Sequence, residues 1–374
     1  MNAATKPDSQ SSLSPASDLD NSTEITGVEI VAGQGLVLRR RPLDAMRAHE
    51  VEIAPLFSFI SAGTELHTLQ ELMAAPEGSH PAARMGYSQC GIITRTGSAV
   101  SGLETGDRVV AIGAGAFHAT RTVVAQNLVS PVPGNVCPRE ASLAAMFCFA
   151  LEGVHKSAVR IGENVVILGA GMMGQMTVRL YQLSGARVCV METNAHRLSF
   201  LPEGTTTFSL DESGWAALAK WAQPHGIEHA SVCFGGDATL AIEKLKSSMS
   251  CAPDGVPHGK IVFPGGAKIS VLMASNMGNI QLLSSAKAGP GYRDTHYESG
   301  ANYPMAYVSH PVRRNIETML RLLQDRQLDI SNLITHTFRF EEAEAAYAML
   351  QQPKVEALAV LLDYATASPT EIRH

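Results

Sequence analysis

The feature that most constrains the fold is a short glycine-rich segment, Gly169-Ala170-Gly171-Met172-Met173-Gly174. The apolar run 165–168 before it predicts a buried strand, and the spacing of apolar residues up to 184 predicts a helix after it. In such a strand–turn–helix, glycines allow a tight turn, close approach of the backbone to a pyrophosphate, and close packing of helix on strand. We therefore predict a dinucleotide site whose phosphates contact Gly169, Gly171, Met172, Met173 and Gly174.

An acidic residue ends the next predicted strand. That strand is predicted at 187–191, and Glu192 follows it directly. A carboxylate there can accept hydrogen bonds from the ribose diol of NAD and repels the 2′-phosphate of NADP. Arg197 follows closely and can pair with that phosphate, so NAD is the expected cofactor and NADP is the alternative. Phe234, Gly235 and Gly265, after later predicted strands, are expected to complete the cofactor site.

The order of predicted elements indicates one domain inserted into another. From 165 to 285, short apolar strands alternate with helices, which is typical of a doubly wound parallel sheet. From 27 to 135, β-branched runs between Gly, Pro and Asp turns predict a barrel-like domain, and a single helix is predicted at 138–159. We expect a disordered tail at 1–25, a barrel domain at 26–155 and 305–374, and a Rossmann domain at 156–304.

Composition excludes several classes of function. The net charge is −6, and no basic run is longer than Arg39-Arg40-Arg41, so a nucleic-acid partner is not expected. No stretch has the 18 or more apolar residues of a membrane span, and no secretory signal is recognisable, so we expect a cytoplasmic protein with no membrane partner. The six cysteines lack the spacing of a zinc knuckle and are expected to be buried thiols.

With the glycine segment in place, the chain resembles the medium-chain dehydrogenase/reductase superfamily from about 27 to 366. The landmarks, in chain order, are Gly106-Asp107-Arg108-Val109, Gly162-Glu163-Asn164-Val165, Leu333-Ile334-Thr335-His336 and Phe340-Glu341-Glu342-Ala343. The resemblance implies a GroES-like β-barrel catalytic domain with an inserted Rossmann domain and an active site between the two. It also implies a homodimer, in which 275–285 would be the sheet edge that pairs between subunits.

The chain departs from the zinc-dependent members of that superfamily. Where they carry a Cys-Gly-Thr-Asp type segment, a Gly-His-Glu segment and a third Cys or Glu ligand, this sequence has Ala62-Gly63-Thr64-Glu65, Gly86-Tyr87-Ser88, and Ala144 or Ala145. These side chains supply no set of zinc ligands, so no metal is expected. The segments 60–65, 289–294, 297–298 and 302–304 resemble a zinc-free branch that includes bacteriochlorophyllide 3-hydroxyethyl dehydrogenases and the dehydrogenase half of bi-domain oxidoreductases.

Without a metal, protein hydrogen-bond donors must stabilise charge on a reacting oxygen. The resemblance makes Thr64 and Tyr87 the leading catalytic candidates and Ser61 a further one, beside Ser88. Glu65, Tyr292, Arg293 and His296 are the predicted substrate contacts, with Arg293 suited to an anionic group. Each has a structural alternative: Thr64 and Glu65 would shape a turn, Tyr87 would fill volume, and 289–303 would be a solvated loop.

These observations lead to three functional hypotheses. The first is a zinc-independent, NAD(P)-dependent oxidoreductase that transfers hydride between nicotinamide and an activated secondary alcohol or ketone of a small molecule, in secondary metabolism. The second is an NADPH-dependent enoyl or quinone reductase. The third is a nucleotide-binding protein without catalytic activity.

Overall fold

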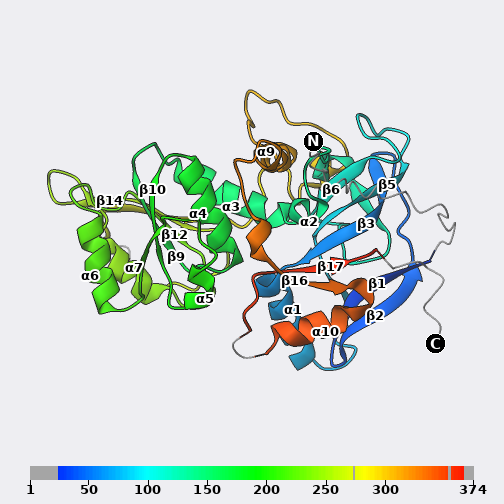
Figure 1. The fold of residues 1–374 in the computed structure, drawn as a ribbon, viewed down its shortest axis with the longest axis horizontal. Helices are drawn as coiled ribbons and strands as arrows, with labels where there is room; N and C mark the ends of the chain where they lie inside the picture. Colours follow the sequence, from blue (N-terminus) through cyan, green and yellow to red (C-terminus); the bar gives the residue numbers. More distant parts are fainter. Residues whose placement is uncertain (1–23, 273, 353–354, 366–374) are drawn as a thin grey trace, which may run out of the picture.

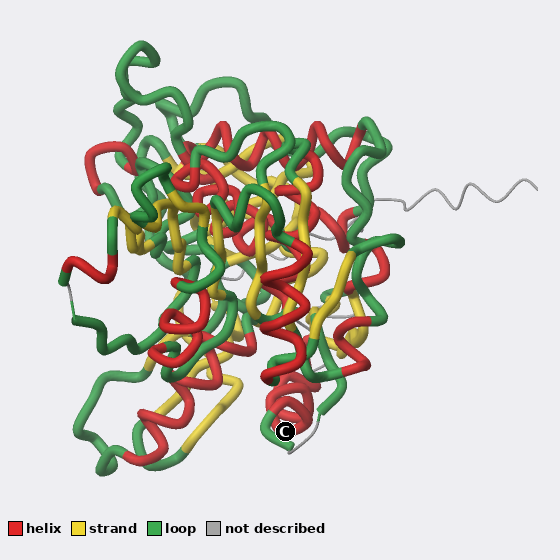
Figure 2. Tube along the Cα trace, turned by 90° about the vertical axis from the view of Figure 1, so that its left-hand side faces the viewer, coloured by secondary structure: helices red, strands yellow, loops and turns green. Residues whose placement is uncertain are grey.

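The computed structural model describes residues 24–272, 274–352 and 355–365, which form two lobes side by side (Figure 1). One lobe is built on mostly antiparallel sheets, with β16 and β17 as a parallel pair, and the other on a mostly parallel sheet. In a view turned by 90°, strands run through the middle of the molecule with helices around them (Figure 2). The predicted fold, a GroES-like domain with an inserted Rossmann sheet, is confirmed.

The GroES-like lobe contains a seven-stranded sheet in the order β16-β17-β3-β5-β6-β8, with β7 also paired to β3. A three-stranded sheet, β2-β1-β4, packs beside it. The strands are β1 Glu24–Val31, β2 Gly35–Pro42, β3 Glu50–Ile60, β4 Ala83–Arg84, β5 Ser88–Thr96, β6 Arg108–Ile112, β7 Thr122–Ala125, β8 Val129–Pro131, β16 Ile334–Arg339 and β17 Ala359–Asp363. The two C-terminal strands therefore complete a sheet begun near the N-terminus.

The predicted disordered tail, 1–25, includes two residues that belong to the first strand. Its residues 1–23 lie outside the described part of the chain, but Glu24 and Ile25 already belong to strand β1. Ile25 is buried, and its register partner on β2 is Arg41. Burial of the apolar face from Ile25 to Ile30 explains why the strand starts there.

The Rossmann lobe has its main strands in the order β11-β10-β9-β12-β14, and β15 pairs with the far side of β14. Their bounds are β9 Asn164–Leu168, β10 Arg187–Met191, β11 Thr206–Phe208, β12 His229–Val232, β14 Pro257–Phe263 and β15 Asn279–Ser284, with the short antiparallel β13 at Ser250–Cys251. Strand order reverses between β9 and β12. Ligands of doubly wound sheets bind beyond the carboxyl ends of strands at such a point.

Strand β9 is buried on both faces of its sheet. Val165 and Ile167 pack into the large core that continues into the GroES-like lobe, whereas Val166 and Leu168 pack into a second core on the opposite face. Helices α3 (Ala144–Ser157) and α4 (Met172–Leu183) belong to the first face, and α6 (Glu212–Trp221) and α7 (Thr239–Lys246) to the second. A parallel sheet covered on both sides explains the continuously apolar sequence of this strand.

The helix predicted at 138–159 is in fact two helices, α2 (Pro138–Ala141) and α3. Ser88 lies in the break between them. Its hydroxyl donates to the carbonyl of Ser142 at 2.6 Å and accepts from the backbone N–H of Ala145 at 3.1 Å. A side chain that satisfies both backbone groups replaces the helical hydrogen bonding there, so Ser88 has a structural role.

The remaining helices are α1 Ala62–Ala74, α5 Ala195–Leu198, α8 Thr295–Glu298, α9 Val312–Gln324 and α10 Ala343–Leu350. Within the described ranges, no helix is long and apolar enough to cross a membrane. The expectation of buried thiols holds for Cys90, Cys148 and Cys189 and is wrong for Cys137 and Cys251, which are exposed.

Because the core is continuous, shortening a buried side chain on strand β17 should strongly lower the stability of the protein. Leu361 is fully buried between β16 and β3, so Leu361→Ala should lower the free energy of unfolding by about 3 kcal/mol. Leu240→Ala is the matched control, because Leu240 is 71% exposed on α7 and should change stability by less than about 0.5 kcal/mol. Urea unfolding followed by circular dichroism measures both, and equal effects would contradict the described packing.

Candidate functional site

A cleft of about 850 Å³ lies between the two lobes. Its GroES-like side includes the predicted residues Ser61, Thr64, Tyr87, Tyr292 and Arg293. Its Rossmann side includes the predicted residues Met173 and Gly265, together with Pro264, Leu282 and Ser284. The structure thus brings predicted catalytic, substrate and cofactor residues from both lobes to one cavity.

The glycine segment joins β9 to α4, and each glycine has a distinct role. Gly169 has φ +96°, a conformation that side chains rarely adopt. A Cβ on Gly174 would lie 2.0 Å from the carbonyl oxygen of Gly169, so only glycine fits there. A Cβ on Gly171 would meet nothing within 4 Å, which leaves the backbone at the start of α4 open to a ligand. An anion suits this position because the first N–H groups of a helix lack partners within it.

Glu192 is buried at the end of β10, where its carboxylate contacts the glycine segment. It accepts hydrogen bonds from the backbone N–H groups of Ala170 at 2.9 Å, Thr193 at 2.8 Å and Asn194 at 2.9 Å. Although burial opposes ionisation, these donors together with Arg197 hold the pKa of Glu192 below its usual value. Nη1 of Arg197 is 3.7 Å from the carboxylate. A charged carboxylate and an exposed guanidinium therefore stand side by side at the predicted ribose site.

The other predicted cofactor residues lie at the same end of the sheet. Phe234 and Gly235 follow β12, and the Cβ of Phe234 is 3.4 Å from the place a Cβ on Gly169 would take. Gly265 follows β14 and lines the cleft. Met172 opens α4 and is half-buried. The carboxyl ends of β9, β12 and β14 thus lie at the same edge of the sheet as the glycine segment.

Helix α1 begins at the cleft, and the sequence analysis missed it. Ser61 is its N-cap residue, yet the Ser61 side chain forms no capping hydrogen bond and lines the cleft. Thr64, in the first turn, is exposed and lines the cleft as well. The missed signal was a serine followed by Leu66, Leu69 and Leu72 at helical spacing. The positive end of the helix dipole therefore faces the cavity.

Tyr87 places its phenol beside these hydroxyl groups. Burial raises the pKa of Tyr87 to about 12, and hydrogen bonds with Ser61 and Thr64 oppose part of that shift. The phenol is therefore protonated at neutral pH and can donate a hydrogen bond. Its ring also forms an edge contact with Phe149 at 6.1 Å between centroids.

Glu65 is buried behind the cleft instead of lining it. Its carboxylate accepts hydrogen bonds from the backbone N–H of Ser61 at 2.8 Å and from the hydroxyl of Tyr347, and it lies 3.2 Å from Nε2 of His118. His118 is fully buried, and its Nδ1 is 2.7 Å from the hydroxyl of Ser58. Glu65 thus supports the start of α1, and its predicted contact with substrate is wrong.

The segment 289–303 packs on the GroES-like lobe through buried aromatic residues, while Arg293 and His296 within it are exposed. Tyr292 and Tyr297 are buried, and Asn127 donates a hydrogen bond to the carbonyl of Tyr297 at 2.8 Å. Tyr292 lines the cleft, whereas His296 is exposed on α8 and lies outside the cleft lining. Arg293 lines the cleft with φ +60°, a left-handed conformation that costs a non-glycine residue about 1 kcal/mol.

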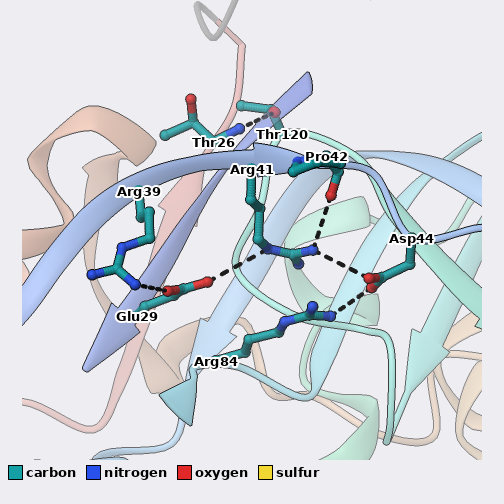
Figure 3. A network of polar contacts seen from close by, with 8 residues as sticks. All are labelled: Thr26, Glu29, Arg39, Arg41, Pro42, Asp44, Arg84 and Thr120. Atoms are coloured by element: carbon teal, nitrogen blue, oxygen red, sulfur yellow. Dashed lines mark hydrogen bonds and ion pairs between the residues drawn. The ribbon is translucent and has the colours of Figure 1, made fainter. Parts of the chain in front are cut away.

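Arg84 also lines the cleft and was not predicted from the sequence. Its Nη1 lies 2.6 Å from a carboxylate oxygen of Asp44, whose other oxygen pairs with Arg41 at 3.4 Å (Figure 3). Arg41 in turn pairs with Glu29 at 3.5 Å, as does Arg39 (Figure 3). Arg84 therefore shares the Asp44 carboxylate with Arg41, and this network of three arginines and two carboxylates keeps one net positive charge.

The residues at the positions that the sequence resemblance assigns to zinc ligands do not offer a set of ligands for this ion. Ala62 and Ala144 offer methyl groups, Ala145 is fully buried, and Tyr87 offers a protonated phenol. Over the described ranges of the chain, no group of three or more His, Cys, Asp or Glu side chains could hold a metal. The dinucleotide position is different, because an open glycine turn, a helix start and a charged carboxylate meet there.

Comparisons with known proteins agree with this geometry. No family model matches the chain. A highly reducing polyketide synthase from Talaromyces stipitatus is 29% identical over 203 residues, which cover 52% of this chain and 8% of that protein. The chain thus matches only a small part of the polyketide synthases to which it is similar. L-arabinitol 4-dehydrogenase from Aureobasidium melanogenum is 23% identical, covering 74% of this chain and 77% of that enzyme.

Solved structures share the whole architecture. A putative zinc-binding dehydrogenase from Sinorhizobium meliloti, bound to NADP, superposes with a TM-score of 0.69 at 20% identity, covering 92% of this chain and all of that one. An alcohol dehydrogenase from Escherichia coli in complex with NADH gives a TM-score of 0.69 at 16% identity, with 92% and 100% covered. The chain therefore has the fold of the medium-chain dehydrogenase/reductase superfamily and is related in sequence to reducing polyketide synthases and to sugar-alcohol dehydrogenases.

Proposed function

We propose that this chain is an NAD(P)-dependent oxidoreductase that interconverts a secondary alcohol and a ketone without a catalytic zinc. One observation carries the proposal: the inter-lobe cleft joins Tyr87, Ser61 and Thr64 to Met173 and Gly265 beside the glycine turn. Hydroxyl donors thereby stand opposite the predicted cofactor site. The proposal includes membership of the zinc-free branch that the sequence resembles.

The chain's own residues would hold the dinucleotide at the end of the Rossmann sheet. The open backbone at Gly171 and the start of α4 would bind the pyrophosphate, and Glu192 would bind the ribose diol. Gly265 would let the nicotinamide end enter the cleft, because it has no side chain and no neighbour within 4 Å of a Cβ position. When bound, the nicotinamide supplies or accepts a hydride.

Tyr87 would stabilise charge on the substrate oxygen. Its phenol is protonated at neutral pH and half-buried, so a hydrogen bond from it acts in surroundings of low dielectric. The N-terminal end of α1 adds a positive electrostatic potential beside Ser61. Together these groups replace the polarising role of a metal.

Thr64 would connect the phenol with solvent. Thr64 interacts with the Tyr87 phenol, which opposes part of the burial-induced rise in the pKa of that phenol, and Thr64 is exposed, whereas Ser61 is buried. A proton given up by Tyr87 during ketone reduction would therefore be replaced through Thr64, and the reverse would hold for alcohol oxidation. Glu65 and His118 keep Ser61 and the first turn of α1 in place.

Replacement of Tyr87 by phenylalanine tests the donor directly. Tyr87→Phe should lower kcat for ketone reduction about a hundredfold, because the oxygen loses its donor. The dissociation constant for NADH should stay within about twofold, since Tyr87 lies on the GroES-like side of the cleft and the glycine turn belongs to the Rossmann lobe. Tyr307→Phe is the matched control, because Tyr307 is 89% exposed. Undiminished turnover in Tyr87→Phe would remove Tyr87 from the mechanism.

The pH profile tests the protonation state. An ordinary tyrosine titrates near pH 10. Because burial raises the pKa of Tyr87 to about 12, its proton is retained at lower pH and is lost only on the far alkaline side. We expect kcat/KM for ketone reduction to show no loss from phenol ionisation between about pH 7 and about pH 10. A decline with a midpoint near 9 that disappears in Tyr87→Phe would contradict the assignment.

Cofactor preference tests the role of Glu192. Its charged carboxylate should make NADH bind at least about tenfold tighter than NADPH. Glu192→Ser should shift the preference toward NADPH, because Arg197 is then free to pair with the 2′-phosphate. Fluorescence titration measures both constants, with Arg321→Gln as a control on exposed surface. Preference for NADPH in the unchanged protein would contradict this assignment.

A second candidate is an enoyl reductase, and the similarity to reducing polyketide synthases favours it. In that case the hydride would reach a carbon conjugated to the carbonyl, with Tyr87 polarising the same oxygen. Aryl ketones and matched enones, offered with NADH and NADPH, separate the candidates. If the protein reduces the enones but not the ketones, and uses NADPH to do so, the result supports the enoyl reductase. Tight cofactor binding without turnover on either panel selects a nucleotide-binding protein.

We also propose a homodimer that forms through β15. This strand pairs with β14 on one side, and across the described chain no other strand covers its outer edge. A strand edge of six residues presents unpaired backbone groups that a second copy could pair. Light scattering at micromolar concentration should give twice the chain mass, and a monomer there would overturn this proposal.

A further inference from the structure

One wall of the cleft is a continuous series of aromatic rings. Phe149 makes edge contacts with Tyr87 at 6.1 Å and with Tyr292 at 5.5 Å between centroids. All three rings line the cavity, and Phe117 lines it as well. Aromatic rings packed edge to face offer both faces and edges to a flat guest. Tyr87, the proposed donor, stands at one end of this wall.

A guanidinium stands at the other end. The Arg293 group lies 5.7 Å from the centroid of the Tyr292 ring. Its backbone is held in the left-handed conformation by a hydrogen bond from the Arg293 N–H to Glu298 at 2.9 Å, and the next residue, Asp294, caps α8. The Arg293 side chain lines the cleft.

The two arginines of the cleft differ in their partners. Arg84 is paired with Asp44 at 2.6 Å, a carboxylate that Arg41 shares. Among the described residues, the guanidinium of Arg293 has no carboxylate within 4.0 Å, and the Glu298 bond is made by the backbone. The Arg293 guanidinium is exposed and interacts with Tyr292 and with the charge of Glu298, but within the described chain no ion pair with a carboxylate occupies it, so it can form a bidentate contact with an anion.

We propose that the substrate is a flat, conjugated molecule that carries an anionic group, a carboxylate or a phosphate, at the end opposite its reacting oxygen. Arg293 binds the anion, the Phe149–Tyr292 pair contacts the flat face, and Tyr87 meets the oxygen. This inference rests on the proposed function and names the substrate class of the same site. A volume of about 850 Å³ accommodates more than one ring beside a nicotinamide.

The test compares an acid with its neutral isostere. 6-Acetyl-2-naphthoate and 6-acetyl-2-naphthamide share ring and ketone and differ in charge, and a 6-acetyl-2-naphthyl phosphate probes the other anion. Binding of each to the full-length protein with saturating NADH is followed by naphthalene fluorescence anisotropy, and turnover by NADH absorbance. We expect one of the anions to bind at least about tenfold tighter than the amide.

The variants assign that difference to a residue. Arg293→Gln should abolish the preference for the anion and leave amide binding within about twofold. Arg293→Lys should restore part of it, because the charge remains but the planar fork is lost. Arg84→Gln should keep the preference, because Arg84 is already paired. Equal binding of anions and amide by the unchanged protein overturns the proposal.

Two further results would also overturn it. The first is a preference that survives Arg293→Gln and is lost in Arg84→Gln. The second is a rise in the NADH dissociation constant of Arg293→Gln while the anion preference persists, which would make Arg293 a cofactor contact. Anion binding through Arg293 without any turnover would support this site and overturn the proposed oxidoreductase, so the two failures are distinguishable.

Discussion

The buried carboxylate of Glu65 fixes the start of α1 against the GroES-like lobe, and the geometry of the cleft follows from it. The carboxylate accepts hydrogen bonds from the Ser61 backbone and the Tyr347 hydroxyl and pairs with His118. A buried carboxylate is tolerated only with such partners. Because they come from separate segments, the brace holds α1 with its N-terminal end toward the cavity. Ser61 and Thr64 are thereby delivered beside Tyr87.

The Rossmann lobe forms the opposite side of the cleft, and close packing of a strand and a helix at the glycine turn determines its geometry. The carbonyl of Gly169 leaves no room for a side chain on Gly174, so strand and helix meet closely and the turn at Gly171 stays open. The large core continues from the barrel strands into α3, α4 and β9. Packing therefore sets the distance between cofactor turn and hydroxyl groups, and the two halves of the site depend on one continuous core.

Sequence reasoning identified what depends on local pattern. The glycine turn and Glu192 could be predicted because strand, turn and helix follow one another in the chain. Pairings between distant segments could not be predicted from periodicity, and these include the contacts of Glu65 with His118 and Tyr347. The break between α2 and α3 could not be predicted for the same reason, because it depends on hydrogen bonds from Ser88, which lies on a separate strand. His296 was chosen by residue type, and the turn of α8 places it outside the cleft.

In the proposed mechanism, protein hydroxyl groups, and not a metal, polarise the reacting oxygen in this cleft. Metal analysis of the active protein tests it most directly, combined with turnover before and after dialysis against a strong chelator. If hydroxyl groups polarise the oxygen, NADH-dependent reduction of a naphthyl ketone should continue unchanged in protein without stoichiometric zinc. One zinc per chain, whose removal abolishes turnover and whose return restores it, would contradict the account.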